Sequence, residues 1–347
     1  MTGEGSGERE AGAAVRHAGP APAGGAPAGG AAAGGAAAGG APAGGAPAGG
    51  AAAGGDLAAQ AAEVTAFRAE LGLGGLIDIH THFMPANVMK KVWAYFDNVP
   101  PSLGQAWPIA YRQPEDERIG LLRAFGVRRF SALNYPHKPG MAAWLNDWSG
   151  DFAARTPDAL HSGTFFPEPG VAGYVAKALA DGARLFKAHL QVGDYDPRAE
   201  LLDPVWDLLA EAGVPVVVHC GSGPFPGRYT GPGPISEVIA RHPRLTVIIA
   251  HFGTPEYAEF LDLAEHRPGV YLDTTMVFTD YLESRAPFPA GQLPRLTGLR
   301  GKILLGSDFP NIPYPYPHQL QALARLGLGA PWLRAVCHDN AAALLGL

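Results

Sequence analysis

Eight apolar runs of strand length alternate with longer amphipathic stretches, and this alternation constrains the fold more than any other feature. The runs span 76–80, 128–135, 160–166, 184–190, 214–220, 245–251, 269–275 and 302–308. Most are apolar throughout, as expected for parallel strands that are buried on both faces. Segments with helical periodicity lie between or after them, and several of these end at Gly or just before Pro, the usual helix terminators. They span 115–126, 171–182, 201–213, 235–243, 255–268, 318–327 and 331–346.

Eight strand–helix units within about 290 residues predict a (β/α)8 TIM-type barrel that forms one domain over residues 57–347. An open, doubly wound sheet is the alternative. A dinucleotide-binding sheet would carry a glycine-rich loop after its first strand, but LIDIHTH stands at that place. The barrel is therefore the expected α/β architecture.

The first part of the chain has a different character. Residues 21–55 consist of consecutive pentapeptides of the form Ala-Pro/Ala-Ala-Gly-Gly. Such a segment has little apolar surface to bury, and ordering its glycines is costly. We therefore expect residues 1–56 to be a disordered, low-complexity leader. The acidic start, MTGEGSGERE, lacks the apolar stretch of a secretory signal.

Charge and cysteine content narrow the functional classes. A net charge of -6, with no local Lys/Arg cluster, provides no basic surface for nucleic acid. No run approaches the ~20 apolar residues of a membrane span. Cys220 and Cys337 match no zinc-ribbon spacing, and although they could form one disulfide, a reducing, cytoplasmic location is the simpler expectation.

Polar residues at the ends of the predicted strands indicate a metal site. In barrels of this kind the active site forms at the carboxyl ends of the strands. His80 and His82 are two residues apart, so an extended chain points both imidazoles to one side. His219 ends the fifth predicted strand and Asp308 the eighth. This ligand set suits one divalent ion with an open position for water, most simply Zn²⁺, although Mn²⁺, Fe²⁺ or Co²⁺ would also fit.

Several motifs together resemble those of a known family. They are IDIHTHFMP (77–85), FKAH (186–189), VPVVVHCG (214–221), VIIAHFG (247–253), ILLGSDFP (303–310) and DNAAALLGL (339–347). In this order they resemble the amidohydrolase superfamily, most closely the amidohydrolase-related branch that includes aminocarboxymuconate-semialdehyde decarboxylase. The resemblance implies that Asp308 is both a metal ligand and catalytic. It also implies that His251 is the catalytic or substrate-polarising histidine.

Three further polar residues lie near the predicted ligands, each with two interpretations. In binuclear members of the superfamily a carboxylated lysine bridges two ions, and Lys187 lies on the matching strand. One ion is usual in the branch that this chain resembles, so we expect a mononuclear site. His189 faces the same side as Lys187 and either lines the pocket or is a core histidine. Asp78 either orients a ligand histidine or caps a neighbouring element.

Two long segments are candidates for substrate contacts. The loop 221–233 carries Arg228 and Tyr229, and it is either a lid whose arginine pairs with a substrate carboxylate or a solvated loop. Segment 83–116 is too long for a simple connection. Its aromatic residues could wall an apolar pocket, form a second core cluster or make a dimer contact; they are Trp93, Tyr95, Phe96, Trp107 and Tyr111.

These features predict a metal-dependent hydrolase that acts on a C–N or C–O bond of a small molecule through a metal-activated water. A metal-dependent, non-oxidative decarboxylase that uses the same ligands is the alternative. A barrel that binds a ligand without turnover is a third hypothesis, and it predicts degenerate ligands, whereas all four are present. A homodimer is compatible with the aromatic segment.

Overall fold

The structure is a computed structural model that describes residues 56–98 and 107–347. The predicted leader lies outside these residues, apart from Asp56. The Asp56 carboxylate accepts hydrogen bonds from the Ala58 and Ala59 amides, and it thereby caps helix α1 (Leu57–Leu71).

The described strands are all parallel and form two sheets. The first contains β1 (Leu76–Asp78), β2 (Val127–Ser131) and β3 (Ala159–Leu160). The second contains, in spatial order, β4 (Ser162–Thr164), β5 (Leu185–His189), β6 (Val216–His219), β7 (Val247–Ile249), β8 (Val270–Asp273) and β9 (Ile303–Leu304). Every predicted run contributes a strand, and the run at 160–166 is divided between β3 and β4.

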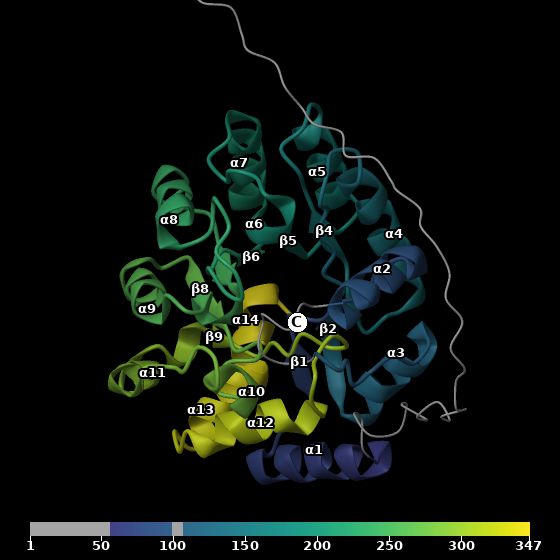
Figure 1. The fold of residues 1–347 in the computed structure, drawn as a ribbon, viewed down its shortest axis with the longest axis vertical. Helices are drawn as coiled ribbons and strands as arrows, with labels where there is room; N and C mark the ends of the chain where they lie inside the picture. Colours follow the sequence, from purple (N-terminus) through teal and green to yellow (C-terminus); the bar gives the residue numbers. More distant parts are fainter. Residues whose placement is uncertain (1–55, 99–106) are drawn as a thin grey trace, which may run out of the picture. The chain divides into compact units, whose positions relative to one another are not determined.

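Backbone hydrogen bonds join the two sheets into a ring. The Ile79 amide donates to the Leu305 carbonyl at 3.0 Å, and the Asp308 amide donates to the His80 carbonyl at 2.8 Å. Thr81 and Phe309 form an isolated parallel bridge along the same seam. On the other side, a single residue separates β3 from β4. The strands surround a common centre and the helices lie outside them (Figure 1), which confirms the predicted TIM-type barrel.

The helices follow the strands as expected for βα units. Those at predicted positions are α3 (Glu115–Ala124), α5 (Val171–Ala180), α7 (Asp203–Ala212), α8 (Pro232–Arg241), α9 (Tyr257–His266), α12 (Tyr316–Arg325), α13 (Ala330–Arg334) and α14 (Asn340–Leu345). Short helices α6 (Leu190–Gly193), α10 (Asp280–Glu283) and α11 (Arg295–Gly298) occupy loops.

Sequence patterns missed three helices, which are α1, α2 (Ala86–Asp97) and α4 (Ala142–Arg155). In α4, the weak helix formers Asn146, Ser149 and Gly150 interrupt the apolar pattern, and tertiary packing compensates for them. The Asn146 side chain, for example, bonds to both the amide and the carbonyl of Thr164. Helix α1 packs on α12 and α13 (Figure 1). These two helices lie far from α1 in the sequence, so the sequence around α1 does not reveal its packing.

The hydrophobic core has two parts. The larger part fills the space between strands and helices and includes the buried Trp206 and Phe125. The smaller part lies inside the barrel and joins residues of six strands to helix α14; its members include Ile77, Leu160, Leu185, Val217, Ile248, Leu304, Ala341 and Leu345. These strand residues precede the polar strand ends by a few positions, so α14 closes the amino-terminal end of the barrel.

Other predictions concern the membrane and the cysteines. Among the described helices, none has both the length and the apolar character needed to cross a bilayer. Cys220 and Cys337 are buried, free thiols.

Two glycines provide a test of the packing. A Cβ atom at Gly163 of β4 would lie 2.4 Å from Cε1 of Phe186, whereas one at Gly173 of α5 would meet no atom within 4 Å. We expect Gly163→Ala to lower the free energy of unfolding by about 1–3 kcal/mol because it overpacks the core. Gly173→Ala, the matched control, should raise it by up to about 1 kcal/mol because alanine favours the helix. Urea denaturation of both variants measures the difference, and equal stabilities would contradict the described packing.

Candidate metal centre

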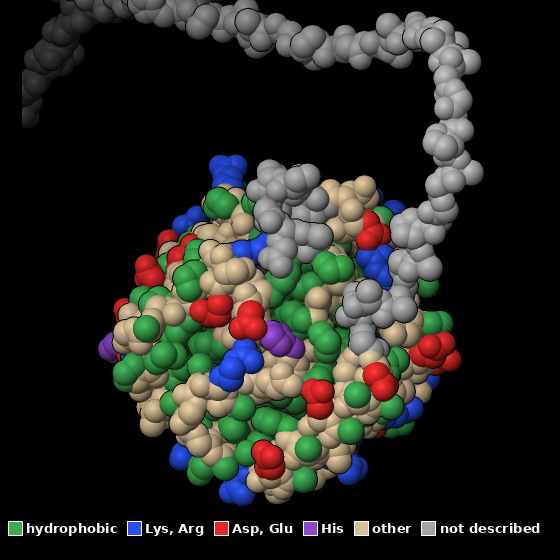
Figure 2. All heavy atoms as spheres, turned by 60° about the horizontal axis from the view of Figure 1, so that its bottom comes forward, with side chains coloured by type: hydrophobic (Ala, Val, Ile, Leu, Met, Phe, Trp, Pro, Cys, Tyr) green, Lys and Arg blue, Asp and Glu red, His purple; other side chains and the backbone are tan. Residues whose placement is uncertain are grey.

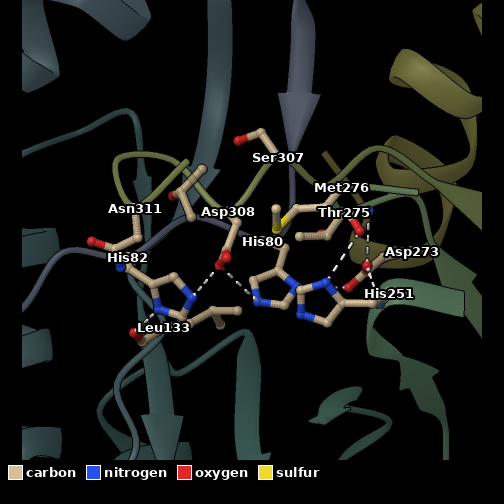
Figure 3. Close-up of polar contacts among 12 residues, drawn as sticks. His80, His82, Leu133, His251, Asp273, Thr275, Met276, Ser307, Asp308 and Asn311 are labelled. Atoms are coloured by element: carbon tan, nitrogen blue, oxygen red, sulfur yellow. Dashed lines mark hydrogen bonds and ion pairs between the residues drawn. The ribbon is translucent and has the colours of Figure 1, made fainter. Parts of the chain in front are cut away.

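The two histidines that follow β1 are each held through one ring nitrogen. Nδ1 of His80 lies 2.8 Å from a carboxylate oxygen of Asp273, which ends β8. Nδ1 of His82 lies 2.9 Å from the Leu133 carbonyl, beyond the end of β2. Figure 3 shows both contacts, with the two imidazoles turned toward Asp308. Both partners are pure acceptors, so each Nδ1 carries the proton and each neutral ring presents a lone pair at Nε2.

Asp308 completes a group of three that could hold a metal ion. Its Oδ1 lies 2.8 Å from Nε2 of His82 and 3.7 Å from Nε2 of His80. The ligand atoms of these three residues lie within 4.8 Å of one another. At this distance the Nε2 lone pair of a neutral His82 and the carboxylate oxygen of Asp308 repel each other. A second proton on His82, or a cation bound to both groups, would remove this repulsion. The donor set therefore fits a divalent ion.

The backbone around Asp308 is strained, and Asp78 helps to hold it. Asp308 has φ 71°, in the left-handed region that side chains disfavour. The preceding residue, Ser307, donates both its amide and its hydroxyl to the fully buried carboxylate of Asp78. Asp78 also accepts the His80 amide and the Tyr316 hydroxyl. Asp78 thus orients the backbone of His80, while Asp273 orients its ring.

Burial and neighbouring groups shift the acidities of both aspartates. Burial raises the pKa of Asp78 to about 7, and the four hydrogen bonds to its carboxylate only partly offset this effect. Burial also raises the pKa of Asp308, but the contact with His82 and the nearby His80 and His251 outweigh it. The net pKa of Asp308 is therefore well below its ordinary value, so this carboxylate is ionised, as a metal ligand must be.

Lys187 lies within the same group. Its side chain is fully buried, and Nζ is 3.2 Å from Nε2 of His80. Burial lowers the pKa of this amine to about 8, against the opposing effect of Asp273 and Asp308. The amine therefore reaches the nitrogen that would bind the metal, as its predicted strand position implied.

His219 and His251 lie beside the three-residue group but outside it. Nε2 of His219 lies 3.1 Å from the Gly223 carbonyl, which leaves the lone pair of a neutral ring on Nδ1. Nδ1 of His251 lies 3.1 Å from the Thr275 carbonyl, which leaves its lone pair on Nε2. The His251 ring centroid is 4.8 Å from that of His219 and 5.1 Å from that of His80.

His251 differs in two respects from what its sequence position suggests. The predicted strand 245–251 ends at Ile249, and His251 itself has φ 54°. Burial, and then the charge that His80 would carry, lower the pKa of His251 to about 4. A neutral His251 in this tautomer accepts a hydrogen bond at Nε2 and cannot donate one. Stabilising an oxyanion, as the resemblance suggested, would require a second proton on this ring.

Asp273 is a residue of this site that the sequence interpretation missed. It binds Nδ1 of His80 through one oxygen and accepts the His251 amide at 2.8 Å through the other (Figure 3). Its place near the end of the predicted strand 269–275 could have identified it, because the other predicted site residues also lie at or near strand ends. Its carboxylate is fully buried. Burial raises its pKa, but contacts with His80, His251 and Lys187 leave the net pKa below its ordinary value.

The aromatic residues of segment 83–116 lie in different surroundings. The indole nitrogens of Trp93 and Trp107 donate to the side chain and the carbonyl of Asn311, which follows Asp308 by three residues. Tyr111 instead is completely buried and donates to Gln60, because its ring packs in the core beneath Phe309. Tyr95 has 60% of its surface exposed.

The remaining predicted substrate contacts lie further out. Arg228 is exposed and lies over the ring of Tyr229, with 5.2 Å from Cζ to the ring centroid. On the face in Figure 2, acidic and basic side chains of the described residues are interspersed among hydrophobic ones. Neither sign of charge dominates this face.

Comparisons with known proteins agree with this fold. A profile of the amidohydrolase family matches residues 77–347. No curated protein matches significantly. Among solved structures, an uncharacterised TIM-barrel protein from Bordetella bronchiseptica has 20% sequence identity and a TM-score of 0.63, covering 78% of this chain and 98% of that one.

Two other structural neighbours have named activities. A 5-carboxyvanillate decarboxylase from Novosphingobium aromaticivorans, solved with manganese, has 15% identity and a TM-score of 0.54, covering 80% of this chain and 99% of that one. A probable 2-pyrone-4,6-dicarboxylic acid hydrolase from Acinetobacter baumannii has 13% identity and a TM-score of 0.52, covering 79% and 100%. At these identities the structures show a shared fold, and the profile match over most of the chain shows that it belongs to the amidohydrolase family of enzymes.

Proposed function

We propose that the protein is a metal-dependent hydrolase that cleaves a C–N or C–O bond in a small molecule. One divalent ion would be held by His80, His82, His219 and Asp308. The observation that supports this proposal most directly is the convergence of the Nε2 lone pairs of His80 and His82 on the carboxylate of Asp308. Their own hydrogen bonds fix both rings in the tautomer that a metal ligand needs.

The ion proposed is Zn²⁺, with Mn²⁺, Fe²⁺ or Co²⁺ as alternatives that suit the same nitrogen and oxygen ligands. Manganese in the Novosphingobium aromaticivorans decarboxylase supports a divalent ion in a barrel of this kind. A mononuclear site agrees with the position of Lys187, whose amine faces His80 at 3.2 Å. Only a carboxylated Lys187 could bridge a second ion.

The chemistry divides among the residues as follows. A divalent ion at this place supplies a water made acidic enough to attack at neutral pH. Asp308 is ionised and lies among the ligands, so its carboxylate can accept the proton of the attacking water and pass it to the leaving group. The Nε2 lone pair of His251 faces the same space and can hold a donor group of the substrate or accept a proton. Arg228 and Tyr229 remain candidates for a substrate carboxylate, from the loop that follows β6.

Decarboxylation is the second candidate, and the structural likeness to 5-carboxyvanillate decarboxylases favours it. In that reaction Asp308 would deliver a proton to the substrate carbon that loses carbon dioxide. Both reactions need the same ligands, so the geometry of the described residues is compatible with either. A cytoplasmic, homodimeric enzyme remains our expectation.

The type of reaction can be tested directly on the metal-loaded protein. We expect activity on a panel of amides, esters and lactones, with release of an amine or an alcohol detected by mass spectrometry. A parallel panel of aromatic carboxylates should release no carbon dioxide. If the aromatic carboxylates released carbon dioxide and no amide, ester or lactone were cleaved, the protein would be a decarboxylase and not a hydrolase.

The number of ions can be measured by elemental analysis. We expect about one equivalent of divalent metal in the wild type, and clearly less in Asp308→Asn and His80→Ala because each removes a ligand. Lys187→Ala should keep its metal. Two equivalents that Lys187→Ala abolishes would make the site binuclear, and a wild type that takes up no metal would refute the metal centre.

The role of Asp273 predicts a separate effect on metal affinity. Asp273→Asn should weaken metal binding by about 10- to 100-fold because the neutral amide no longer fixes the His80 ring or raises its basicity. Asp262→Asn is the matched control, since Asp262 forms only an exposed ion pair with Arg295 on the protein surface. Competition with a chromophoric chelator gives both affinities. Equal values would show that Asp273 does not orient the ligand.

A further inference from the structure

His189 differs from the other histidines of the site in the direction of its hydrogen bond. His80, His82, His219 and His251 each have one ring nitrogen that faces an acceptor, namely a carboxylate or a carbonyl. Nδ1 of His189 instead accepts the Val192 amide at 3.3 Å. An amide is only a donor, so Nδ1 of His189 holds the lone pair and Nε2 holds the proton.

The surroundings of His189 fix the ring in this state. His189 and His219 are register partners on β5 and β6, and their rings stack with 4.1 Å between centroids at 12°. The Tyr135 ring lies 4.8 Å away on another side. These two ring contacts and the bond from the Val192 amide restrict rotation of the ring.

This tautomer excludes one role and favours another. A neutral imidazole binds a metal through its lone pair, which in His189 faces the Val192 amide. His189 is therefore poorly suited to bridge or bind an ion. Its Nε2–H bonds to no described residue. His189, His219 and His251 each keep about 9% of their surface exposed and the Asp308 side chain 14%, whereas His80 keeps 1%. The open side of the site therefore includes His189.

We propose that His189 is a substrate-positioning residue whose Nε2–H donates to an sp² oxygen of the substrate, of a carboxylate or a carbonyl group. The bond from the Val192 amide to Nδ1 leaves the N–H on Nε2, where it can donate to such an oxygen. The inference rests on the proposed function, since the oxygen that it recognises belongs to the substrate of the metal centre. It also gives His189 a role distinct from that of the ligand His219 beside it.

Three substitutions distinguish a donor at Nε2 from a structural ring. His189→Phe keeps an aromatic ring against His219 and Tyr135 but has no donor. Asparagine and glutamine place an amide near the positions of Nδ1 and Nε2 respectively, so His189→Asn loses the donor and His189→Gln keeps it. The probe is 4-hydroxy-3-methoxy-5-nitrobenzoate, a carboxylate bound by a structural neighbour, whose nitrophenol absorbance reports binding.

We expect His189→Phe and His189→Asn to weaken binding of the probe about 10- to 100-fold, the usual effect of losing a hydrogen bond to a charged group. His189→Gln should stay within about threefold of the wild type. All three variants should keep the metal content of the wild type. Nitrogen-15 NMR of His189 should show a proton on Nε2 and none on Nδ1.

Three outcomes would overturn the inference. Equal binding by all variants, or a metal-loaded wild type that does not bind the probe, would remove the positioning role and leave the metal centre intact. Loss of metal from His189→Phe would make His189 a ligand instead. Failure of the proposed function itself would be recognised separately, as a wild type without metal.

Discussion

The seam between β1 and the segment after β9 determines the geometry of the whole site. Hydrogen bonds along this seam close the barrel. One edge of the seam carries His80 and His82, and the other edge carries Asp308. The buried carboxylate of Asp78 bonds to both edges at once, through the His80 amide and through Ser307. Barrel closure and ligand geometry therefore depend on the same few hydrogen bonds.

A second carboxylate connects this seam to the neighbouring strands β8 and β7. Asp273, at the end of β8, holds the His80 ring with one oxygen and the His251 amide with the other. The His80 ring is thereby assigned its tautomer. Backbone carbonyls outside the metal position assign the tautomers of the other rings, those of His82, His219 and His251. Since these tautomers decide which nitrogen can bind an ion, the scaffold specifies the chemistry before any ion or substrate arrives.

Much of the fold and part of the site could be read from the sequence. Continuous apolar runs mark buried parallel strands, and the two-residue period places His80 and His82 on one side. The contacts that complete the site were not readable, because they join residues far apart in the chain. Asp273 meets His80 across 193 positions. The orientation of His189 depends on a backbone amide in the turn after β5, and no side-chain pattern records such a bond. Helix α1 was missed for a related reason, since its packing partners lie near the carboxyl terminus.

The left-handed backbone at Asp308, His251 and Phe252 has a consequence for how the protein could evolve. Each such residue costs about 1–2 kcal/mol relative to glycine, which adopts this conformation freely. Replacement of Asp308 or His251 by glycine would relieve that cost and remove the side chain proposed to act there in the same step. Selection for thermal stability alone would therefore favour loss of the proposed centre, which would be kept only under continued selection for turnover.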